Sequence, residues 1–374
     1  MAGSECIRNH RISLDQSRRH DILTKAINPE RYIRFGDVLV NSTGTGTLGR
    51  VAQVRAEPSE PTTVDTHVTI VRPIDGMFYP EYFGYMLVKI EDEIISSGEG
   101  ASGQTELPRS KLTNSFVVSF PESLEEQKRI VAILDQAFEG IAAATANAEK
   151  NLANARELFE SYLSCVFNCD SDNWTQENLG HICENLDSKR VPITKSKRIH
   201  GDIPYYGASG VVDHVADCLF DEDLLLVSED GANLLARTYP IAFSISGKAW
   251  VNNHAHVLRF NDASSQKFVE YYLNSISLKS YVSGMAQPKL NQRSLNSIKV
   301  PFPSLTEQVR FVDALDKMSD QSKQLEAIFT QKLTALTELK QSLLQKAFSG
   351  ELTPDFLTPT PDFQQRKISR LLLI

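Results

Sequence analysis

The sequence predicts an α+β fold in which two globular domains alternate with two long antiparallel coiled-coil helices, as an internal repeat with a pseudo-twofold relation. The segment PESLEEQKRIVAIL at 121–134 returns as PSLTEQVRFVDAL at 303–315, and Phe167 corresponds to Phe348 at the same offset of 181. Upstream, the two copies correspond at offsets of 183 to 187. Such small drift indicates two copies of one unit, each a globular part followed by a helical part.

The helical parts are predicted from apolar spacing. In the second copy Leu325, Phe329, Leu333, Leu336, Leu339 and Leu343 form a stripe of coiled-coil type. No proline lies between Pro121 and Phe167 or between Pro303 and Phe348, so each helix can run for about 40 residues, or ~60 Å. Alanines at 142–148 allow another backbone to pack closely. Antiparallel packing of the two helices would put the globular parts at opposite ends of a rod.

The globular parts begin with buried strands. Short apolar runs at 38–40 and 224–227 predict strands, and 240–251 and 254–260 predict further strands. Residues 80–89 and 266–274 predict short amphipathic helices. The expected boundaries are 1–120 for the first globular domain, 121–168 for the first helix, 169–302 for the second domain, 303–350 for the second helix and 351–374 for a C-terminal tail.

Composition excludes some classes of protein and leaves others open. No run of about 18 apolar residues predicts a membrane span. The five cysteines lack C-x-x-C spacing, which argues against a zinc site and is typical of the cytoplasm. The net charge of −8 does not exclude nucleic acid, because binding depends on where the positive charge lies.

Patterns typical of catalysis are weak. Gly44, Gly46 and Gly49 match G-x-G-x-x-G, but no helix pattern follows them. His254 and His256 lack companion ligands at metal-site spacing, so we interpret them as structural or hydrogen-bonding residues. We find no nucleophile with a nearby base and no set of metal-binding acids. The sequence therefore predicts a chain without catalytic residues, metal or cofactor of its own.

The loops suit nucleic acid. Polar residues follow the first strand of each copy at 41–50 and 228–237, and the segment 189–198 holds five basic residues and no acid. Such side chains can bind phosphates and base edges. The candidate DNA-binding residues are Thr43, Thr45, Thr47, Arg50, Gln104, Lys189, Arg190, Lys195, Lys197, Arg198, Tyr206, Asn233, Arg237, Lys248, Asn252, Gln287 and Lys289.

The sequence resembles the specificity subunits of type I restriction–modification enzymes. The matching text includes FGDVLVN and SFPESLEEQKRIVAILD in the first copy, and IPYYGASGVVDHVADCLFDEDLLLVSEDGA, AQPKLNQRSLNSIKVPFPSLTEQ and LTELKQSLLQKAFSGEL in the second. The resemblance implies two target-recognition domains, each reading half of a split site in double-stranded DNA. It also implies two modification (methyltransferase) subunits as partners, together with restriction (motor and nuclease) subunits. S-adenosylmethionine, ATP and Mg would be bound by those partners.

Two departures from the family pattern bear on the first domain. Trp174 precedes Asp223 by 49 residues, whereas the corresponding Asp37 has only 36 residues before it. We therefore expect the first domain either to lack about a dozen leading residues or to begin in a different way. The tail from Thr353 to Ile374 extends beyond the usual end, and we expect it to be a disordered extension.

Other functions stay open at this point. The same features fit the recognition subunit of a related single-complex restriction enzyme. A non-DNA coiled-coil adaptor with two ligand-binding heads is a third possibility, and an enzyme in its own right would need motifs that we do not find.

If the loops read DNA, substitution of Arg50 or Arg237 should weaken recognition of one half-site only. Selection of bound duplexes would measure this effect, and equal loss at both half-sites would contradict the assignment.

Overall fold

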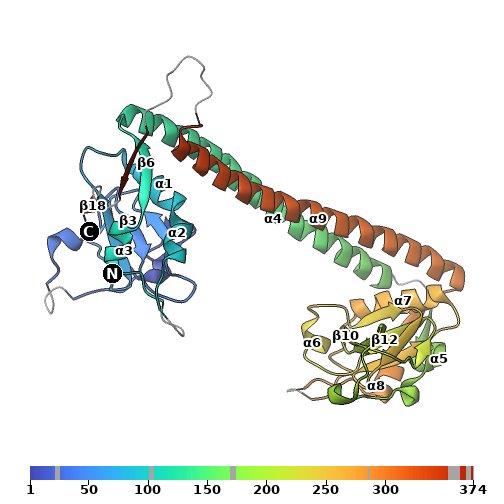
Figure 1. Ribbon diagram of the computed structural model, residues 1–374. Helices are drawn as coiled ribbons and strands as arrows, with labels where there is room; N and C mark the ends of the chain where they lie inside the picture. Colours follow the sequence, from blue (N-terminus) through green and yellow to red (C-terminus); the bar gives the residue numbers. More distant parts are fainter. Residues whose placement is uncertain are drawn as a thin grey trace. The chain divides into compact units, whose positions relative to one another are not determined.

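The computed structural model describes residues 1–21, 26–100, 105–168, 174–284, 287–352, 363–367 and 372–373. These residues form two compact units (Figure 1). Unit 1 consists of Met1–Glu149 and Gln331–Ile374, and unit 2 consists of Lys150–Thr330. We call the globular part of unit 1 the first head and that of unit 2 the second head.

The first head and the helix that follows it are built from short elements joined by loops. They are β1 (Ile7–Arg8), β2 (Arg11–Ile12), β3 (Val38–Asn41), β4 (Val51–Gln53), β5 (Val68–Pro73), α1 (Pro80–Lys89), α2 (Glu91–Ser96), α3 (Arg109–Asn114), β6 (Val117–Pro121) and α4 (Leu124–Asn168). A strand, β4, follows the glycine-rich loop at 44–49. The loop therefore lacks the helix that a dinucleotide site requires there.

The second head repeats this order with a longer lead and additional strands. Its elements are β7 (Thr175–Asn178), α5 (Leu179–Ile182), β8 (Glu184–Asn185), β9 (Ile203–Gly207), β10 (Gly210–Val215), β11 (Phe220–Asp221), β12 (Leu224–Ser228), α6 (Asn233–Ala236), β13 (Ala242–Ile245), β14 (Lys248–Val251), β15 (Ala255–Arg259), α7 (Ala263–Ser275), α8 (Gln292–Asn296) and β16 (Lys299–Phe302). The helix α9 (Leu305–Ser349) follows, and then β17 (Phe363–Lys367) and β18 (Leu372–Leu373).

Each head is organised around the same antiparallel sheet. The strand order is β18-β5-β3-β4 in the first head, and the equivalent strands of the second head lie in the order β8-β15-β12-β13. The register is also the same, since Val38 pairs with Val71 as Leu225 pairs with Leu258. The central strands β3 and β12 are buried throughout. The mixed helix-and-sheet fold and the internal repeat predicted from the sequence are thus confirmed.

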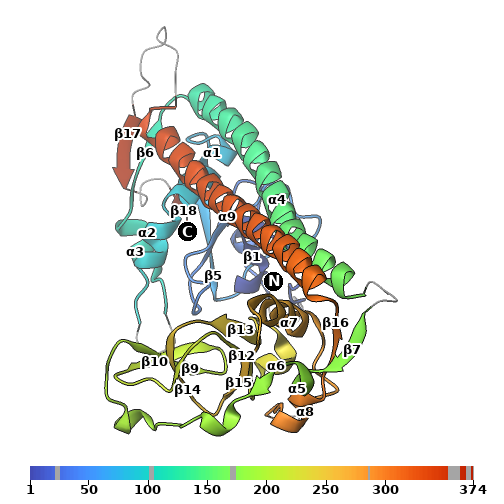
Figure 2. The same cartoon turned by 90° about the vertical axis from the view of Figure 1, so that its right-hand side faces the viewer.

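The C-terminal tail completes the first head, so the expectation that it is a disordered extension was wrong for its described residues. Lys367 of β17 pairs with Val117, as Asn178 of β7 pairs with Lys299 in the second head. Leu373 of β18 pairs with Arg72, as Glu184 of β8 pairs with Arg259. The tail therefore supplies the two strands that the lead of the second head supplies there (Figure 2). These strands satisfy main-chain groups that would otherwise lie unpaired at sheet edges.

The two long helices begin in the same way. Gln127 and Gln308, both fully buried, each donate through Nε2 over 2.8 Å to a nearby proline carbonyl, Pro121 and Pro303 respectively. The other amide atom of Gln127 accepts from the Tyr79 amide. This explains the repeated proline and Glu-Gln pattern, because a buried amide must find partners on both of its atoms.

A second pair of contacts fastens each helix to its head. Tyr271 of α7 donates over 2.5 Å to Asp316 of α9, and Tyr85 of α1 donates to Asp135 of α4. Burial, together with the aspartate, raises the pKa of Tyr85 to about 12. The phenols are therefore donors at physiological pH, and the same bond holds the helix to the head in both units.

Within each unit the two helices run antiparallel. In unit 1 Leu134 near the start of α4 shares a core with Leu344 and Ala347 near the end of α9. In unit 2 Leu163 near the end of α4 shares a core with Leu315 near the start of α9. The predicted apolar stripe of α9 is only partly buried, and Leu325 and Leu339 are exposed. A helix that packs against one partner helix buries only the face toward that partner.

Close approach of the helices follows from small residues. In unit 2 Ser322 Oγ of α9 donates over 2.7 Å to the carbonyl of Ala155 in α4, and both residues are buried.

Among the helices of the described residues, none combines the length and the apolar character that a membrane span requires.

A chain ending at Leu352 should lose stability in the first head only. Removing β17 and β18 exposes main-chain groups of β5 and β6 and the core around Phe363, so amide exchange should accelerate in those strands. Hydrogen–deuterium exchange of the full chain and the truncated chain would measure this. In β15 and β16 of the second head, exchange should be the same in the two chains. If exchange in β5 and β6 were also the same in the two chains, the role of the tail would be contradicted.

Candidate nucleic-acid interface

Two loops that are far apart in the sequence meet in each head. In the first head the Leu107 amide donates over 2.8 Å to the carbonyl of Ser42. In the second head the Leu290 amide donates over 2.8 Å to the carbonyl of Glu229. A second bond runs beside each, from Gly44 to Thr105 and from Gly231 to Pro288. We call 42–44 with 105–107, and 229–231 with 287–290, the loop pairs.

Each loop pair carries a histidine at its side. His67 Nδ1 lies 2.6 Å from Thr43 Oγ1, and His254 Nδ1 lies 2.8 Å from an oxygen of Asp230. The two histidines occupy equivalent positions in the repeat. The partner of His67 is a hydroxyl, whereas the partner of His254 is a carboxylate. The two heads therefore present different charge on the same main-chain frame.

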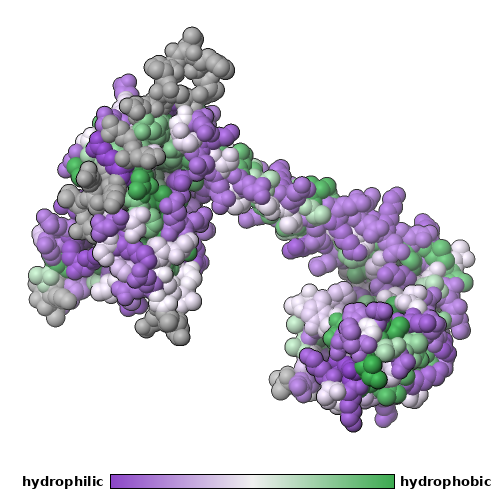
Figure 3. Space-filling model, viewed as in Figure 1, coloured by the Kyte–Doolittle hydropathy of each residue, from purple (hydrophilic) through white to green (hydrophobic). Residues whose placement is uncertain are grey.

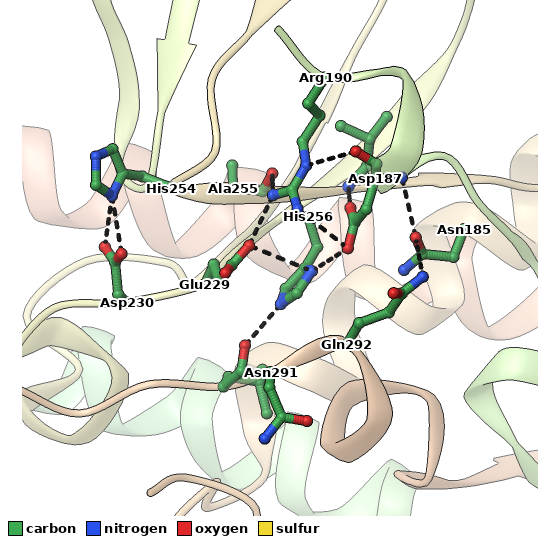
Figure 4. A network of polar contacts seen from close by, with 12 residues as sticks. Asn185, Asp187, Arg190, Glu229, Asp230, His254, Ala255, His256, Asn291 and Gln292 are labelled. Carbon is green, nitrogen blue, oxygen red and sulfur yellow. Dashed lines mark hydrogen bonds and ion pairs between the residues drawn. The ribbon is translucent and has the colours of Figure 1, made fainter. Parts of the chain in front are cut away.

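The difference extends to the residues behind the loop pairs. In the first head Ser42 and Thr69, both buried, share a hydrogen bond of 2.5 Å. In the second head the corresponding residues are Glu229 and His256, which belong to a network of charged groups (Figure 4). The main chain is conserved between heads while the buried side chains are not.

His256 is the centre of this network and is only 1% exposed. Its Nδ1 lies 2.6 Å from Asp187 Oδ2, and its Nε2 lies 2.7 Å from the carbonyl of Leu290. Both ring nitrogens of His256 thus have a hydrogen-bond partner. The interpretation of His256 as a hydrogen-bonding residue is confirmed.

Arg190 joins the network from the other side. Its Nη1 lies 2.7 Å from Glu229 Oε2 and also donates over 2.7 Å to the carbonyl of Ala255. Burial alone would raise the pKa of Asp187, but hydrogen bonds from His256 and the Val257 amide, with the charge of Arg190, hold the pKa of this carboxyl below its usual value. The network ties the basic segment to the second loop pair.

Asp187, Glu229 and His256 place three potential metal-ligand atoms within 4.8 Å of one another. The guanidinium of Arg190 lies 2.7 Å from Glu229 and 3.4 Å from Asp187, so a cation already compensates both carboxylates. The donor set therefore suits an internal ion-pair network better than a metal ion.

The basic segment divides into exposed and internal residues. The side chains of Lys189, Lys195 and Lys197 are exposed. Arg198 instead lies 2.8 Å from Asp213 and stacks on the Tyr205 ring at 4.2 Å. Three lysines are thus available for phosphate, whereas Arg190 and Arg198 hold the segment in place.

Several other predicted residues of the second head have internal partners. Asn233 is buried and its amide bonds Thr238 and Tyr239. Asn252 is buried and accepts from the His254 amide over 2.8 Å. Tyr206 is half-buried with its ring 6.1 Å from that of Phe243. These residues shape the loops from within.

Arg237 differs most from its expected role. It has a left-handed backbone at φ 53°, and its Nη1 donates over 3.2 Å to the carbonyl of Leu273, with a further bond to Ile276. These are carbonyls at the C-terminal end of α7, where a cation is favourable. Burial lowers the pKa of Arg237. The sequence could not distinguish this internal position from an exposed one.

The remaining predicted residues stay at the surface or line the first loop. Lys248, Gln287 and Lys289 are exposed, and Lys289 Nζ lies 3.2 Å from Glu229. In the first head Thr45 is exposed, Thr43 and Thr47 are half-buried, and Arg50 donates over 2.7 Å to the carbonyl of Gly46. Gln104 lies outside the described residues. Of the predicted residues, the first loop pair therefore contains Thr43. The second loop pair contains Gln287 and Lys289, which lie opposite Asp230.

Sequence reasoning missed Asp187 and Glu229, which hold the second loop pair. Nothing in their spacing connects them to His256, because the strand order of the sheet brings them together. The one available signal was an acid placed just before the basic segment 189–198.

Asp187→Asn should destabilise unit 2 at neutral pH by about 3 kcal/mol, because it leaves His256 and Arg190 with one carboxylate fewer in a buried network. Since the pKa of Asp187 is lowered by folding, its contribution is present above the ordinary pKa of about 4 and is lost as pH falls through the folded value. Urea unfolding at several pH values would measure this. Asp213→Asn, at the less buried pair that Asp213 forms with Arg198, should have a smaller effect and serves as the control.

Arg237→Ala should lower stability by about 1–2 kcal/mol, because the carbonyls at the end of α7 lose their donor. This replaces the expectation that Arg237 acts only on one half-site. Chemical denaturation would detect the loss, and Lys248→Ala, at an exposed residue of the same head, should leave stability unchanged. Full stability of Arg237→Ala would restore the earlier assignment.

Comparison with known proteins gives consistent results. A family model described as the type I restriction modification DNA specificity domain matches residues 171–335. A Haemophilus influenzae protein named as a type I restriction enzyme specificity subunit is 31% identical over 141 residues, 38% of this chain and 36% of that protein. The EcoDI specificity subunit of Escherichia coli is 37% identical over 75 residues, 20% of this chain and 17% of that protein. The matched segments thus span 36% and 17% of the lengths of these two relatives.

Solved structures share the fold over most of the chain. The HsdS subunit from Thermoanaerobacter tengcongensis aligns with a TM-score of 0.57 and 20% identity, covering 94% of this chain and 90% of that one. A chain from a type I R-M system, solved to explain complex assembly and conformational transition, aligns with a TM-score of 0.66 and 19% identity, covering 86% and 83%. The second half of this chain is thus similar to the type I restriction modification DNA specificity domain, and the solved structures share the fold.

Proposed function

We propose that this chain is the non-catalytic DNA-recognition subunit of a type I restriction–modification system. Each head reads one part of a two-part site in double-stranded DNA. The helices α4 and α9 connect the heads and carry two modification subunits, to which restriction subunits bind. S-adenosylmethionine, ATP and Mg bind to those partner subunits. The complex is located in the cytoplasm.

One observation carries this proposal. Both heads hold their loop pairs by the same main-chain hydrogen bonds, yet the exposed residues differ, with Glu106 in one head at the position of Lys289 in the other. A conserved frame with different side chains suits a protein that reads two unlike sequences, because base edges are distinguished by their donors and acceptors.

The exposed lysines of the second head support the proposal. Lys189, Lys195 and Lys197 lie on a segment that the Asp187 network fixes beside the second loop pair. Lysines at the edge of a reading surface bind phosphate and position the protein without reading sequence.

The test is a selection of DNA by the assembled complex. The chain is produced with a modification subunit of its own system, and the duplexes that the complex retains from a random pool are sequenced. We expect an enriched motif in two parts with a fixed unspecified gap. A complex that assembles but enriches nothing would favour the adaptor function instead.

The variant Lys195→Gln with Lys197→Gln should weaken binding equally across sequences. Loss of two phosphate contacts should reduce the slope of log K against log salt by about 2. Salt titration of binding to a fixed duplex would measure it, with Lys128→Gln on α4 as the control. A changed motif at unchanged salt dependence would assign these lysines to base reading.

A further inference from the structure

One residue of each loop pair occupies the same place in the two heads but carries the opposite charge. The Glu106 amide donates over 2.8 Å to the carbonyl of Glu99, and the Glu106 carbonyl accepts from the Glu99 amide over 2.9 Å. In the second head the main chain of Lys289 makes the same two bonds with Ser283, over 2.8 Å and 2.9 Å. The main-chain frame therefore places Glu106 and Lys289 alike.

The residue that follows determines the side to which each of these side chains points. Leu107 comes after Glu106 and Leu290 after Lys289, and both leucines are buried in the cores of their heads. Because neighbouring side chains of an extended chain point to opposite sides, Glu106 and Lys289 point away from those cores, and both are exposed. Each loop pair thus presents one charged group outward at the same position.

Exposure of a charged side chain is not in itself unusual in this protein, because hydrophilic residues make up much of the visible surface of both heads (Figure 3). Glu106 and Lys289 differ from other exposed residues in lying on main chain that hydrogen bonds hold on two sides. A polar side chain on such a fixed backbone meets a ligand at a defined place, since only its own torsions remain to be ordered on binding.

Lys289 is also held by a carboxylate beneath it. Its Nζ lies 3.2 Å from Glu229 Oε1, and the side chain of Glu229 is only 12% exposed whereas that of Lys289 is 54% exposed. The other oxygen of Glu229 accepts from Arg190 over 2.7 Å, so a second cation already compensates this carboxylate in part. An ammonium group has three N–H donors. Lys289 therefore keeps donors for a ligand while its contact with Glu229 orders the side chain.

Glu106 has the opposite chemistry and no comparable partner. In the parts of the chain that the structure describes, no cation forms an ion pair with its carboxylate, and the nearby Lys111 is paired with Glu99 at 2.6 Å instead. Next to DNA phosphates such a carboxylate is repelled unless it accepts a hydrogen bond there. Among base edges in the major groove, the amino group N4 of cytosine is the donor that glutamate accepts from.

We propose that Lys289 and Glu106 are specificity-determining residues that read the same kind of base pair in opposite orientations. Lys289 donates to O6 and N7 of a guanine, and Glu106 accepts from N4 of a cytosine. On the strand that the loop pair faces, one head thus requires guanine and the other cytosine. This inference rests on the proposed function, which supplies the DNA, and it adds the base pair that each head requires at one position.

The test repeats the DNA selection with two exchanges of charge, each in the full chain assembled with a modification subunit of its own system. Glu106→Lys should change one cytosine–guanine pair of one half-motif to guanine–cytosine. Lys289→Glu should make the reverse change at one pair of the other half-motif. All other positions should stay as they are for the unsubstituted chain, because the main-chain frame does not depend on residue type.

A neutral variant accompanies the exchange in the second head, because Lys289→Glu brings a second carboxylate close to Glu229. Lys289→Met keeps a long side chain and adds no charge. In titrations of two duplexes that differ only at the assigned pair, it should lose about ten-fold of the preference for guanine. The slope of log K against log salt should not change, since a contact with a base replaces no counterion of a phosphate.

Matched controls exist in both heads. Lys279 in the second head and Glu60 in the first are exposed and lie outside the loop pairs. Lys279→Glu and Glu60→Lys introduce the same changes of charge, and both should leave the two half-motifs unchanged.

The outcomes separate this inference from the proposed function. If the unsubstituted chain enriches a two-part motif and neither exchange alters a base pair, the assignment of Lys289 and Glu106 is wrong and the proposed function stands. Changes in both half-motifs after one exchange would also overturn the assignment, because they would indicate a structural role. An unchanged motif with a salt slope lower by about 1 would assign Lys289 to a phosphate instead. No enrichment by the unsubstituted chain would overturn both proposals.

Discussion

The antiparallel packing of α4 against α9 is the constraint on which the rest of the structure depends. Within unit 1 the start of α4 shares a core with the end of α9, so the chain leaves α9 beside the first head. The segment that follows can then pair with β5 and β6. In unit 2 the segment after α4 pairs with β15 and β16 in the same way. Each head is completed by the chain that leaves a long helix next to it, and the first head is built from both ends of the sequence.

Main-chain bonds and side-chain bonds have different tasks in the two heads. The sheet register, the loop pairs and the glutamines at the helix starts are the same in both. Because main-chain bonds do not depend on residue identity, the residues that they carry can change. The hydroxyl pair Ser42 and Thr69 thus corresponds to the carboxylate and imidazole of Glu229 and His256. The frame is kept while its chemistry diverges.

The candidate site could be predicted only in part. Polar loops after buried strands were identifiable, because a buried strand is apolar and its loop is not. The sequence did not predict which of the basic residues face solvent, since Lys195 and Arg198 occur in similar sequence surroundings. In the structure the first is exposed, whereas the second is held by Asp213 and Tyr205. Arg237 shows the same difficulty, because its acceptors are main-chain carbonyls that no residue type reveals.

The sequence by itself determined the repeat, the two long helices and the central strands, because these follow from spacing and periodicity along one segment. The tertiary structure alone decided the pairing of segments that are far apart in the chain. The Asp187 network needs strand order to bring its members together, and the tail, which carries no clear strand pattern, forms strands where sheet edges are open to it. Edge pairing depends on the proximity of main chains rather than on the residues that they carry.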